Sequence, residues 1–166
     1  MRIAILSAPL YEDVELLVPY YRLLEAGHDV ELVGCESGTT VEGKRGTSVV
    51  TTVSAADAGQ VDGVIIPGGY SPDHMRRCPA MVELVERALA DGSVVAAICH
   101  GPWMLASAAD LAGRRLTSFF SIRDDLENAG AEWVDEAVVI DGNVITSRTP
   151  DDLPAFMRAV VSALEG

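Results

Sequence analysis

The fold is decided by one stretch, VVAAICHGP at positions 94–102. Its apolar start is typical of a strand that is buried on both faces of a parallel sheet. Cys99 and His100 follow the strand at once, and Gly101 and Pro102 then lead into a helix. A nucleophile on a sharp strand-to-helix turn forms a nucleophile elbow. The stretch therefore predicts an α/β fold in which Cys99 is the reactive residue at the carboxyl edge of the sheet.

Strand and helix patterns alternate along the rest of the chain. Short apolar runs predict strands at 2–7, 30–33, 63–66 and 94–98, a β excursion over 39–53 and a hairpin over 138–146. Apolar residues three or four positions apart predict helices at 12–26, 79–90, 102–109, 122–129 and from 149 onward. This alternation indicates βαβ units and a mainly parallel sheet. We expect a flavodoxin-like three-layer sandwich that forms one domain over residues 1–166.

The first helix is expected to bury one stripe and to end at Gly27. Its start, Glu12, has an ordinary interpretation as an acid that complements the positive end of the helix dipole. The predicted stripe consists of Val14, Leu17, Tyr21 and Leu24.

Composition excludes several classes of function. A net charge of −13, with eleven scattered Arg and the single lysine Lys44, argues against nucleic-acid binding. The acidity indicates a soluble surface, and the sequence alone does not separate a salt-adapted host from a GC-rich genome. Near the N-terminus the apolar run is too short for a signal peptide or a membrane span. Three cysteines without disulfide-like spacing predict a reducing, cytoplasmic compartment.

A second loop is expected to meet the elbow. Pro67, Gly68 and Gly69 follow the strand at 63–66, so they also lie at a carboxyl edge. The backbone N–H of His100, with one from Gly68 or Gly69, is expected to form an oxyanion hole. Cys99 would lie at a helix N-terminus, so the pKa of its thiol is expected to be low. The alternative interpretation of Cys99 is an unreactive cysteine buried in the core.

The histidines narrow the possible mechanisms. Only His28, His74 and His100 are present, so a hydrolase triad that needs a later histidine is disfavoured. Leu105 occupies the position where a Cys-x5-Arg phosphate loop needs arginine. His74 and Cys78 are four residues apart, but two ligands do not make a metal site. The chain also lacks a glycine-rich phosphate loop, and we expect no metal and no cofactor.

Six stretches together resemble the PfpI branch of the DJ/PfpI superfamily, a class I glutamine amidotransferase-like group, along nearly the whole chain. They are residues 11–15, 24–30, 66–69, 97–102, 128–135 and 147–154. Each stretch is a weak indication alone, and their order and spacing make the resemblance specific.

The resemblance implies a role for each matching residue. Cys99 would be the nucleophile, and Glu12 would be the carboxylic acid that hydrogen-bonds its sulfur. His100 would be the acid/base, oriented by a carboxylate from a neighbouring subunit at the position of Asp73, where relatives more often carry Glu. His74, next to Asp73, is a rival for that role. The pocket wall would include Trp103, unless it packs in the core, and Phe119, where relatives often carry Tyr.

The resemblance also implies a function. It suggests a cysteine hydrolase that acts on peptide or amide bonds, or on reactive carbonyls and their protein adducts, as in glyoxalase III or deglycase stress protection. Such an enzyme would be a cytoplasmic homo-oligomer with its active site at the interface. Its partners would be a small carbonyl or peptide substrate and further copies of itself, with no nucleic acid and no membrane. The alternative is a non-catalytic redox-sensing stress protein or chaperone that uses oxidation of Cys99.

Overall fold

The computed structural model describes residues 1–166 and contains a central sheet of seven strands. All neighbouring strands are parallel except the last hairpin, β10 with β11. The order across the sheet is β10 (Val138–Asp141), β11 (Val144–Ser147), β7 (Val94–Ile98), β6 (Gly63–Ile66), β1 (Arg2–Leu6), β2 (Asp29–Gly34) and β5 (Val53–Ser54). The predicted α/β fold with a mainly parallel sheet is confirmed.

Helices connect the strands and cover both faces of the sheet. They are α1 (Asp13–Glu25), α2 (Ser71–Arg76), α3 (Pro79–Ala90), α4 (Trp103–Ala108), α5 (Arg123–Asn128) and α6 (Leu153–Glu165), with short 3-10 turns at Phe120–Ile122 and Pro150–Asp152. Two small sheets lie outside the central one, β3 (Thr40–Glu42) with β4 (Ser48–Val50) and β8 (Arg115–Leu116) with β9 (Glu132–Trp133). No helix has the length and apolar character that a membrane crossing requires.

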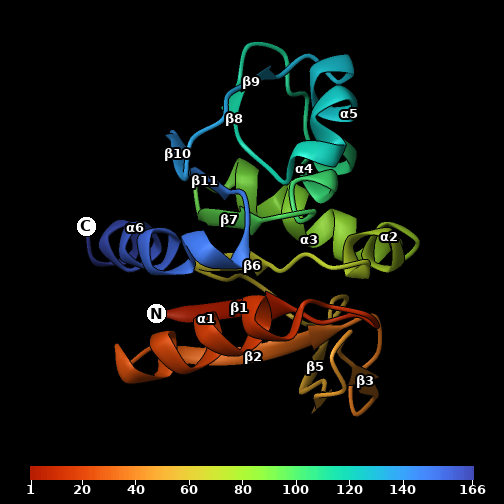
Figure 1. Ribbon diagram of the computed structural model, residues 1–166. Coiled ribbons are helices and arrows are strands. Elements are labelled where there is room, and N and C mark those ends of the chain that lie inside the picture. Colours follow the sequence, from red (N-terminus) through yellow and green to blue (C-terminus); the bar gives the residue numbers. More distant parts are fainter.

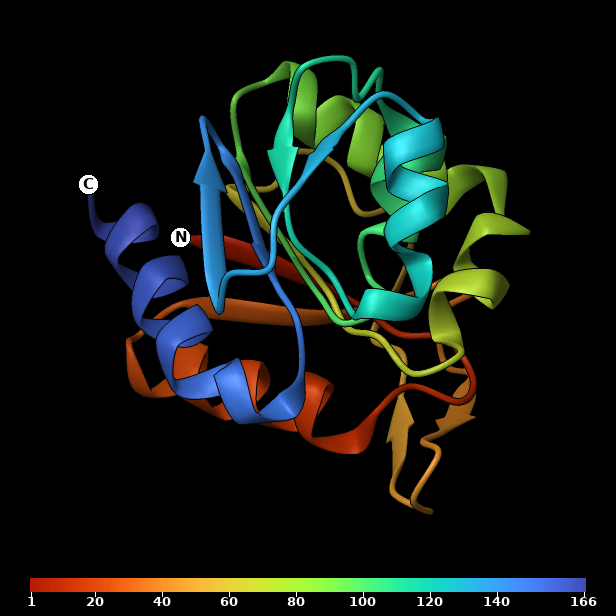
Figure 2. The same ribbon diagram turned by 45° about the horizontal axis from the view of Figure 1, so that its top comes forward.

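The sheet is the middle of three layers. Helices α1 and α6 lie on one face, and α3, α4 and α5 lie on the other (Figures 1 and 2). Each face has its own apolar core, with Leu16 and Phe156 in the first and Met81 and Leu105 in the second. The carboxyl ends of β1, β2, β6 and β7 point to the same edge, where the β3–β4 hairpin and α2 also lie (Figure 1). The loops that carry chemistry therefore converge at this edge.

The predicted buried stripe of the first helix is wrong. Val14, Tyr21 and Leu24 are at least 38% exposed. The buried residues are instead Asp13, Glu15, Leu16, Pro19 and Leu23. Because α6 and the sheet enclose this other face, two acidic side chains at the start of α1 are carried inward.

A disulfide joins Cys35 and Cys78, contrary to the expectation of three free cysteines. The two residues are 43 positions apart, so no local spacing indicates the bond. The fold makes it possible, because the end of β2 and the start of α3 lie together at the carboxyl edge and the Cα–Cα distance is 6.0 Å. Only Cys99 remains a free thiol, and the cysteine count no longer argues for a reducing compartment.

Phe156→Ala should lower the free energy of unfolding by about 3–5 kcal/mol, because this residue of α6 is fully buried in the core on one face of the sheet and truncation leaves a cavity. Phe120→Ala is the matched control, since 71% of Phe120 is exposed, and should cost less than about 1 kcal/mol. Urea unfolding followed by circular dichroism measures both changes. Equal losses for the two variants would contradict the assignment of the core.

Candidate active site

Cys99 lies at the end of β7 with its backbone held on both sides. Its N–H donates to the Ser147 carbonyl at 3.0 Å, and its own carbonyl accepts from the Phe119 N–H at 2.9 Å. Its φ of 61° lies in the left-handed region, which non-glycine residues rarely adopt. These contacts stabilise a conformation that the cysteine would otherwise leave, and the side chain remains only 8% exposed. The geometry is that of the expected elbow.

Glycines allow the neighbouring segments to approach the elbow. A Cβ at Gly68 would lie 2.7 Å from Glu15 Oε2 and 2.8 Å from the His100 nitrogen. A Cβ at Gly101 would lie 2.4 Å from the Ile66 carbonyl oxygen. Neither position has room for a side chain. The loop of Pro67, Gly68 and Gly69 (the PGG loop) and the elbow therefore meet through backbone atoms alone.

The two candidate oxyanion donors of the PGG loop are now distinguished. The Gly68 N–H donates to Glu15 Oε2 at 2.8 Å and is not free for a substrate. The N–H groups of Gly69 and His100 are directed at the Cys99 sulfur, where they lower the thiol pKa. The structure thus places the Gly69 and His100 amides beside the sulfur, and the oxyanion hole formed by them stays a prediction.

Glu15, not Glu12, is the carboxylic acid beside Cys99. It is fully buried in α1. Burial raises the pKa of Glu15, and its hydrogen bonds with the Gly68 N–H and the Cys99 thiol lower that pKa by less. The net effect raises the pKa of Glu15 from 4.5 to about 7. Its Oε1 is buried without a hydrogen-bond partner in the protein. A protonated carboxyl group with a free O–H can donate to a thiolate, so this side chain suits the role first expected of Glu12.

The charges of Cys99 and Glu15 are coupled. Burial and the adjacent Glu15 carboxylate raise the pKa of the Cys99 thiol to about 12, against the depression expected at a helix N-terminus. Both causes oppose a second negative charge in the pair. The pair therefore carries one negative charge above about pH 7, and the thiolate exists when the remaining proton lies on Glu15.

His100 contacts the sulfur directly. Its Nδ1 lies 3.2 Å from Cys99 Sγ, and its Nε2 lies 3.2 Å from the hydroxyl of Ser121. The ring stacks on Phe119 at a centroid distance of 5.1 Å and meets Trp103 edge-on at 5.4 Å. Burial, and then the charge of Lys44, lower the pKa of His100. At neutral pH the imidazole is therefore uncharged and can both accept and donate a proton.

Glu12 forms ion pairs instead of contacting the sulfur. It caps α1, and its carboxylate accepts from Arg45 Nε at 2.6 Å and from Lys44 Nζ at 3.3 Å. Both cations come from the turn between β3 and β4, which lies over the start of the helix. Three residues further along, Glu15 is one helical turn deeper and reaches the elbow. The structure therefore places Glu15, and not the predicted Glu12, beside the sulfur.

Of the other predicted side chains, only Phe119 lines the cavity over Cys99. Trp103 packs behind the imidazole and donates its indole N–H to Asp125. Asp73 lies in α2, is exposed, and forms an ion pair with Arg77 in its own chain. Within the same chain, Nε2 of the His100 imidazole pairs with the Ser121 hydroxyl.

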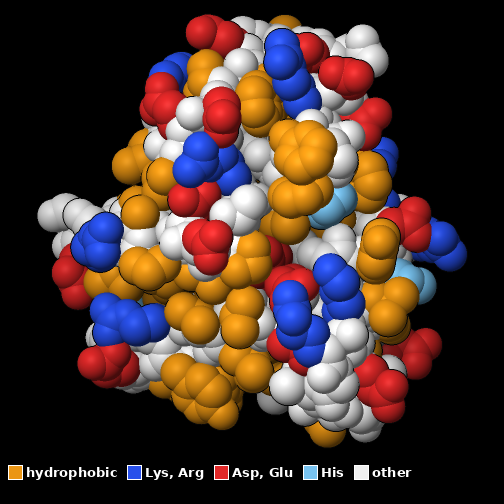
Figure 3. Space-filling view, viewed as in Figure 1, with side chains coloured by type: hydrophobic (Ala, Val, Ile, Leu, Met, Phe, Trp, Pro, Cys, Tyr) orange, Lys and Arg blue, Asp and Glu red, His pale blue; other side chains and the backbone are white.

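The cavity over Cys99 has a volume of about 560 Å³. Its remaining lining includes acidic, basic and aromatic side chains from four segments: Glu12, Glu15, Lys44, Arg45, Tyr70 and Ser121. Lys44 and Arg45 bring positive charge to its mouth in a chain of net charge −13. In Figure 3 basic side chains lie close to a histidine and to an apolar group on this face. No group of three or more His, Cys, Asp or Glu side chains is arranged to hold a metal ion.

The cavity residues that were not predicted include Glu15, Lys44, Arg45 and Ser121. For Glu15 a sequence signal existed, because an apolar face built on Leu16, Pro19 and Leu23 leaves an acid at the buried start of the helix. The other three are brought to the site by tertiary contacts and have no local pattern.

The fold and site define the class as an α/β protein with a cysteine elbow, and comparison with known proteins gives the family. The chain matches the DJ-1/PfpI family over residues 1–163 and belongs to it. It is 45% identical over 167 residues to the protein named Deglycase PfpI of Pyrococcus furiosus, covering 99% of this chain and 100% of that one. It is 43% identical over 168 residues to General stress protein 18 of Bacillus subtilis, covering 99% and 98% of the two chains.

Solved structures agree with this membership. A two-domain protein of Anabaena variabilis with DJ-1/ThiJ/PfpI-like and ferritin-like domains superimposes with a TM-score of 0.96 at 42% identity. The match covers 99% of this chain and 48% of that one, so this chain spans about half of that protein. Drosophila melanogaster DJ-1beta gives a TM-score of 0.91 at 30% identity, covering 98% and 89%.

The rate of Cys99 alkylation by iodoacetamide should rise with pH with a midpoint near 7, because the Glu15–Cys99 pair loses its first proton there. Below that pH both groups are protonated and no thiolate exists. In Glu15→Gln the thiol must titrate alone in a buried site, so the midpoint should move to about 8.5 or above. Glu12→Gln is the matched control and should lower the midpoint only slightly, because the charge of Glu12 is a lesser cause of the raised pKa of Glu15. A shift in the Glu12 variant with none in the Glu15 variant would reverse the assignment.

Proposed function

We propose that this protein is an enzyme that converts reactive carbonyls, or their early adducts on proteins, through the thiolate of Cys99. This is a glyoxalase III or deglycase type of activity with a protective role under stress. One observation carries the proposal: the Cys99 sulfur faces a cavity and lies against two backbone N–H groups and a carboxyl group whose pKa is about 7. The names of the Pyrococcus and Bacillus relatives support the two parts of the proposal, deglycation and stress protection.

The first step uses the two backbone donors. The thiolate adds to the aldehyde carbon of a dicarbonyl, and the carbonyl electron pair moves onto oxygen. The N–H groups of Gly69 and His100 stabilise the developing negative charge, and a proton from Glu15 then gives the neutral hemithioacetal. Because Glu15 is half-protonated near neutral pH, it is suited to give this proton and to take it back.

The second step moves a proton between the two carbons of the substrate. An uncharged His100 removes the proton from the carbon bonded to sulfur, and the neighbouring carbon receives a proton, which yields a thioester. Water then hydrolyses the thioester, and the 2-hydroxy acid leaves while the Cys99 thiol is restored. One water is consumed for each dicarbonyl, with no external oxidant or reductant. A hemiaminal adduct of an amine first breaks its C–N bond, the hydroxyl proton passes to nitrogen, and the free amine leaves; the regenerated dicarbonyl then follows the same two steps.

Purified protein incubated with methylglyoxal should form lactate with many turnovers for each Cys99, since the thiol is regenerated. Cys99→Ala should reduce the rate by about 10³-fold or more, and Glu15→Gln should lower kcat more than Glu12→Gln does. Lactate release and loss of dicarbonyl absorbance measure the rate. Loss of Cys99 without an effect on the rate would contradict the proposal.

A panel of peptide and amide substrates, assayed with the same variants, distinguishes the alternatives. Cys99-dependent cleavage of peptides without carbonyl turnover would identify a peptidase or amidase. A single oxidation of Cys99 by peroxide, with no turnover of either substrate class, would identify a redox sensor or chaperone.

We further propose that the enzyme acts in the cytoplasm as a homo-oligomer in which Asp73 of one subunit orients His100 of another. Asp73 is exposed and forms no contact with His100 of its own chain, as a residue acting across an interface requires. A two-fold interface would give each subunit the other's Asp73.

Mixing inactive Asp73→Ala with inactive Cys99→Ala subunits should restore activity, because hybrid assemblies contain sites with both residues intact. For freely exchanging dimers the recovery should be about one quarter of the wild-type rate. Sedimentation measures the assembly in parallel. An active monomer, or an Asp73→Ala variant with the wild-type rate, would show that Ser121 alone orients the imidazole.

A further inference from the structure

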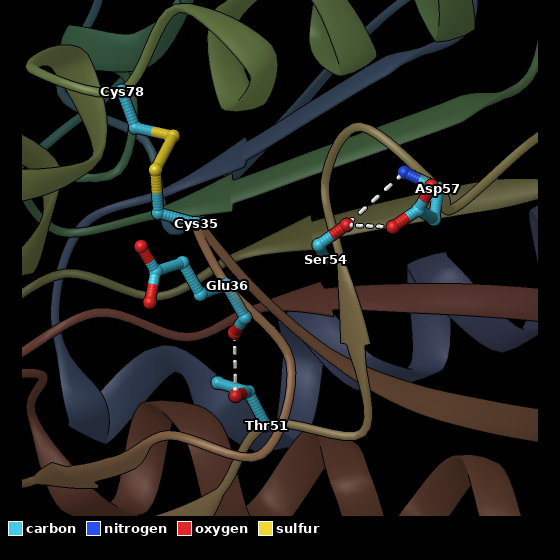
Figure 4. The surroundings of a disulfide bond; sticks show 6 residues. All are labelled: Cys35, Glu36, Thr51, Ser54, Asp57 and Cys78. Carbon is cyan, nitrogen blue, oxygen red and sulfur yellow. Dashed lines mark hydrogen bonds between the residues drawn. A yellow bond between two sulfur atoms is a disulfide. The ribbon is translucent and has the colours of Figure 1, made fainter.

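The Cys35–Cys78 disulfide lies at a second cavity of the same sheet edge. Cys35 directly follows β2, and Cys78 joins α2 to α3, so the bond links two segments that no other covalent bond connects (Figure 4). Both cysteines line a cavity of about 390 Å³ together with Glu36, His74 and Arg77. None of the residues that line this cavity also lines the cavity over Cys99. The disulfide is therefore separate from the candidate active site.

The two sulfur-bearing residues differ in access. Cys35 is exposed, whereas Cys78 is only 6% exposed and packs into the apolar core beneath α3. A thiolate breaks a disulfide by attacking one sulfur in line with the bond while the other sulfur leaves. Access therefore favours attack on Cys35 and departure of Cys78.

The surroundings of Cys78 both favour and oppose a leaving thiolate. Cys78 is the N-cap of the twelve-residue helix α3, where the helix dipole favours negative charge. His74 and Arg77 face the same cavity and are the basic groups there, while Glu36 is the acidic one. Arg77 remains partly engaged with Asp73 at the surface. The helix and the basic groups favour a leaving thiolate, whereas burial in the apolar core opposes it, so the exposure of Cys35 decides the direction of attack.

We propose that Cys35–Cys78 is a thiol–disulfide exchange site that reacts with low-molecular-weight thiols entering this second cavity. The thiolate of the small molecule forms a bond to Cys35 Sγ, the Cys35–Cys78 bond breaks, and Cys78 leaves with the electron pair and takes up a proton. A second small thiolate attacks the mixed disulfide, which frees Cys35 and releases the oxidised small-molecule disulfide. Two thiols thus supply the two electrons that reduce the pair, and the reverse sequence closes the bond again.

The first test identifies the sulfur that is attacked. A Cys99→Ser protein, which keeps only the Cys35–Cys78 pair, is treated with glutathione without denaturant, quenched in acid and analysed by peptide mass spectrometry. The expected intermediate carries glutathione on Cys35, and prolonged treatment should leave both cysteines open to alkylation. Glutathione found on Cys78, or a bond that opens only in denaturant, would overturn the proposal. Protein purified with both thiols free should close the bond when glutathione disulfide is added, and failure to do so would count equally against it.

The second test compares the two sulfurs singly. Cys78→Ser and Cys35→Ser, each in the Cys99→Ser background, leave one cysteine of the pair for reaction with glutathione disulfide. Cys35 should form the mixed disulfide at least about tenfold faster than Cys78, because it is exposed. Equal rates in two folded variants would overturn the proposed direction of attack. If either variant fails to fold by circular dichroism, the first test decides, since it leaves both cysteines in place.

Discussion

The absence of a side chain at Gly68 is the constraint on which the candidate site depends. Its nitrogen donates to Glu15, and its Cα lies so close to Cys99 and His100 that a Cβ would meet all three. The ends of β6 and β7 and the first turn of α1 are therefore held together by one hydrogen bond and close backbone packing. A side chain at this position would separate the carboxyl group from the sulfur and break the proton coupling between them.

Much of the fold could be predicted because its central strands are short apolar runs with clear ends. The bounds of β6, β7 and α3 agree with the sequence pattern, since glycine, proline and the elbow residues punctuate them. The orientation of α1 could not be predicted in the same way. Apolar residues occur on more than one side of this helix, and the packing of α6 and the sheet decides which side is buried. The short helix α2 and strands β8 and β9 have too few residues to show a period.

The candidate site could likewise be predicted only in part. Cys99, His100 and Gly69 follow strands directly, so their meeting at one edge could be predicted from the alternation of strands and helices. The acid was placed one turn too early, because the rotation of α1 was unknown. Ser121 and the disulfide have no local pattern at all. Each depends on segments far apart in sequence, and only the order of strands in the sheet brings them together.

The position of Lys44 has a practical consequence for labelling and cross-linking. It is the only lysine, so it carries the only side-chain amine in the sequence. Lys44 lies at the mouth of the cavity over Cys99. A fluorophore attached to this side-chain amine would therefore report from the mouth of the cavity. A short cross-linker between lysine side chains would join two chains only where their cavity mouths face each other.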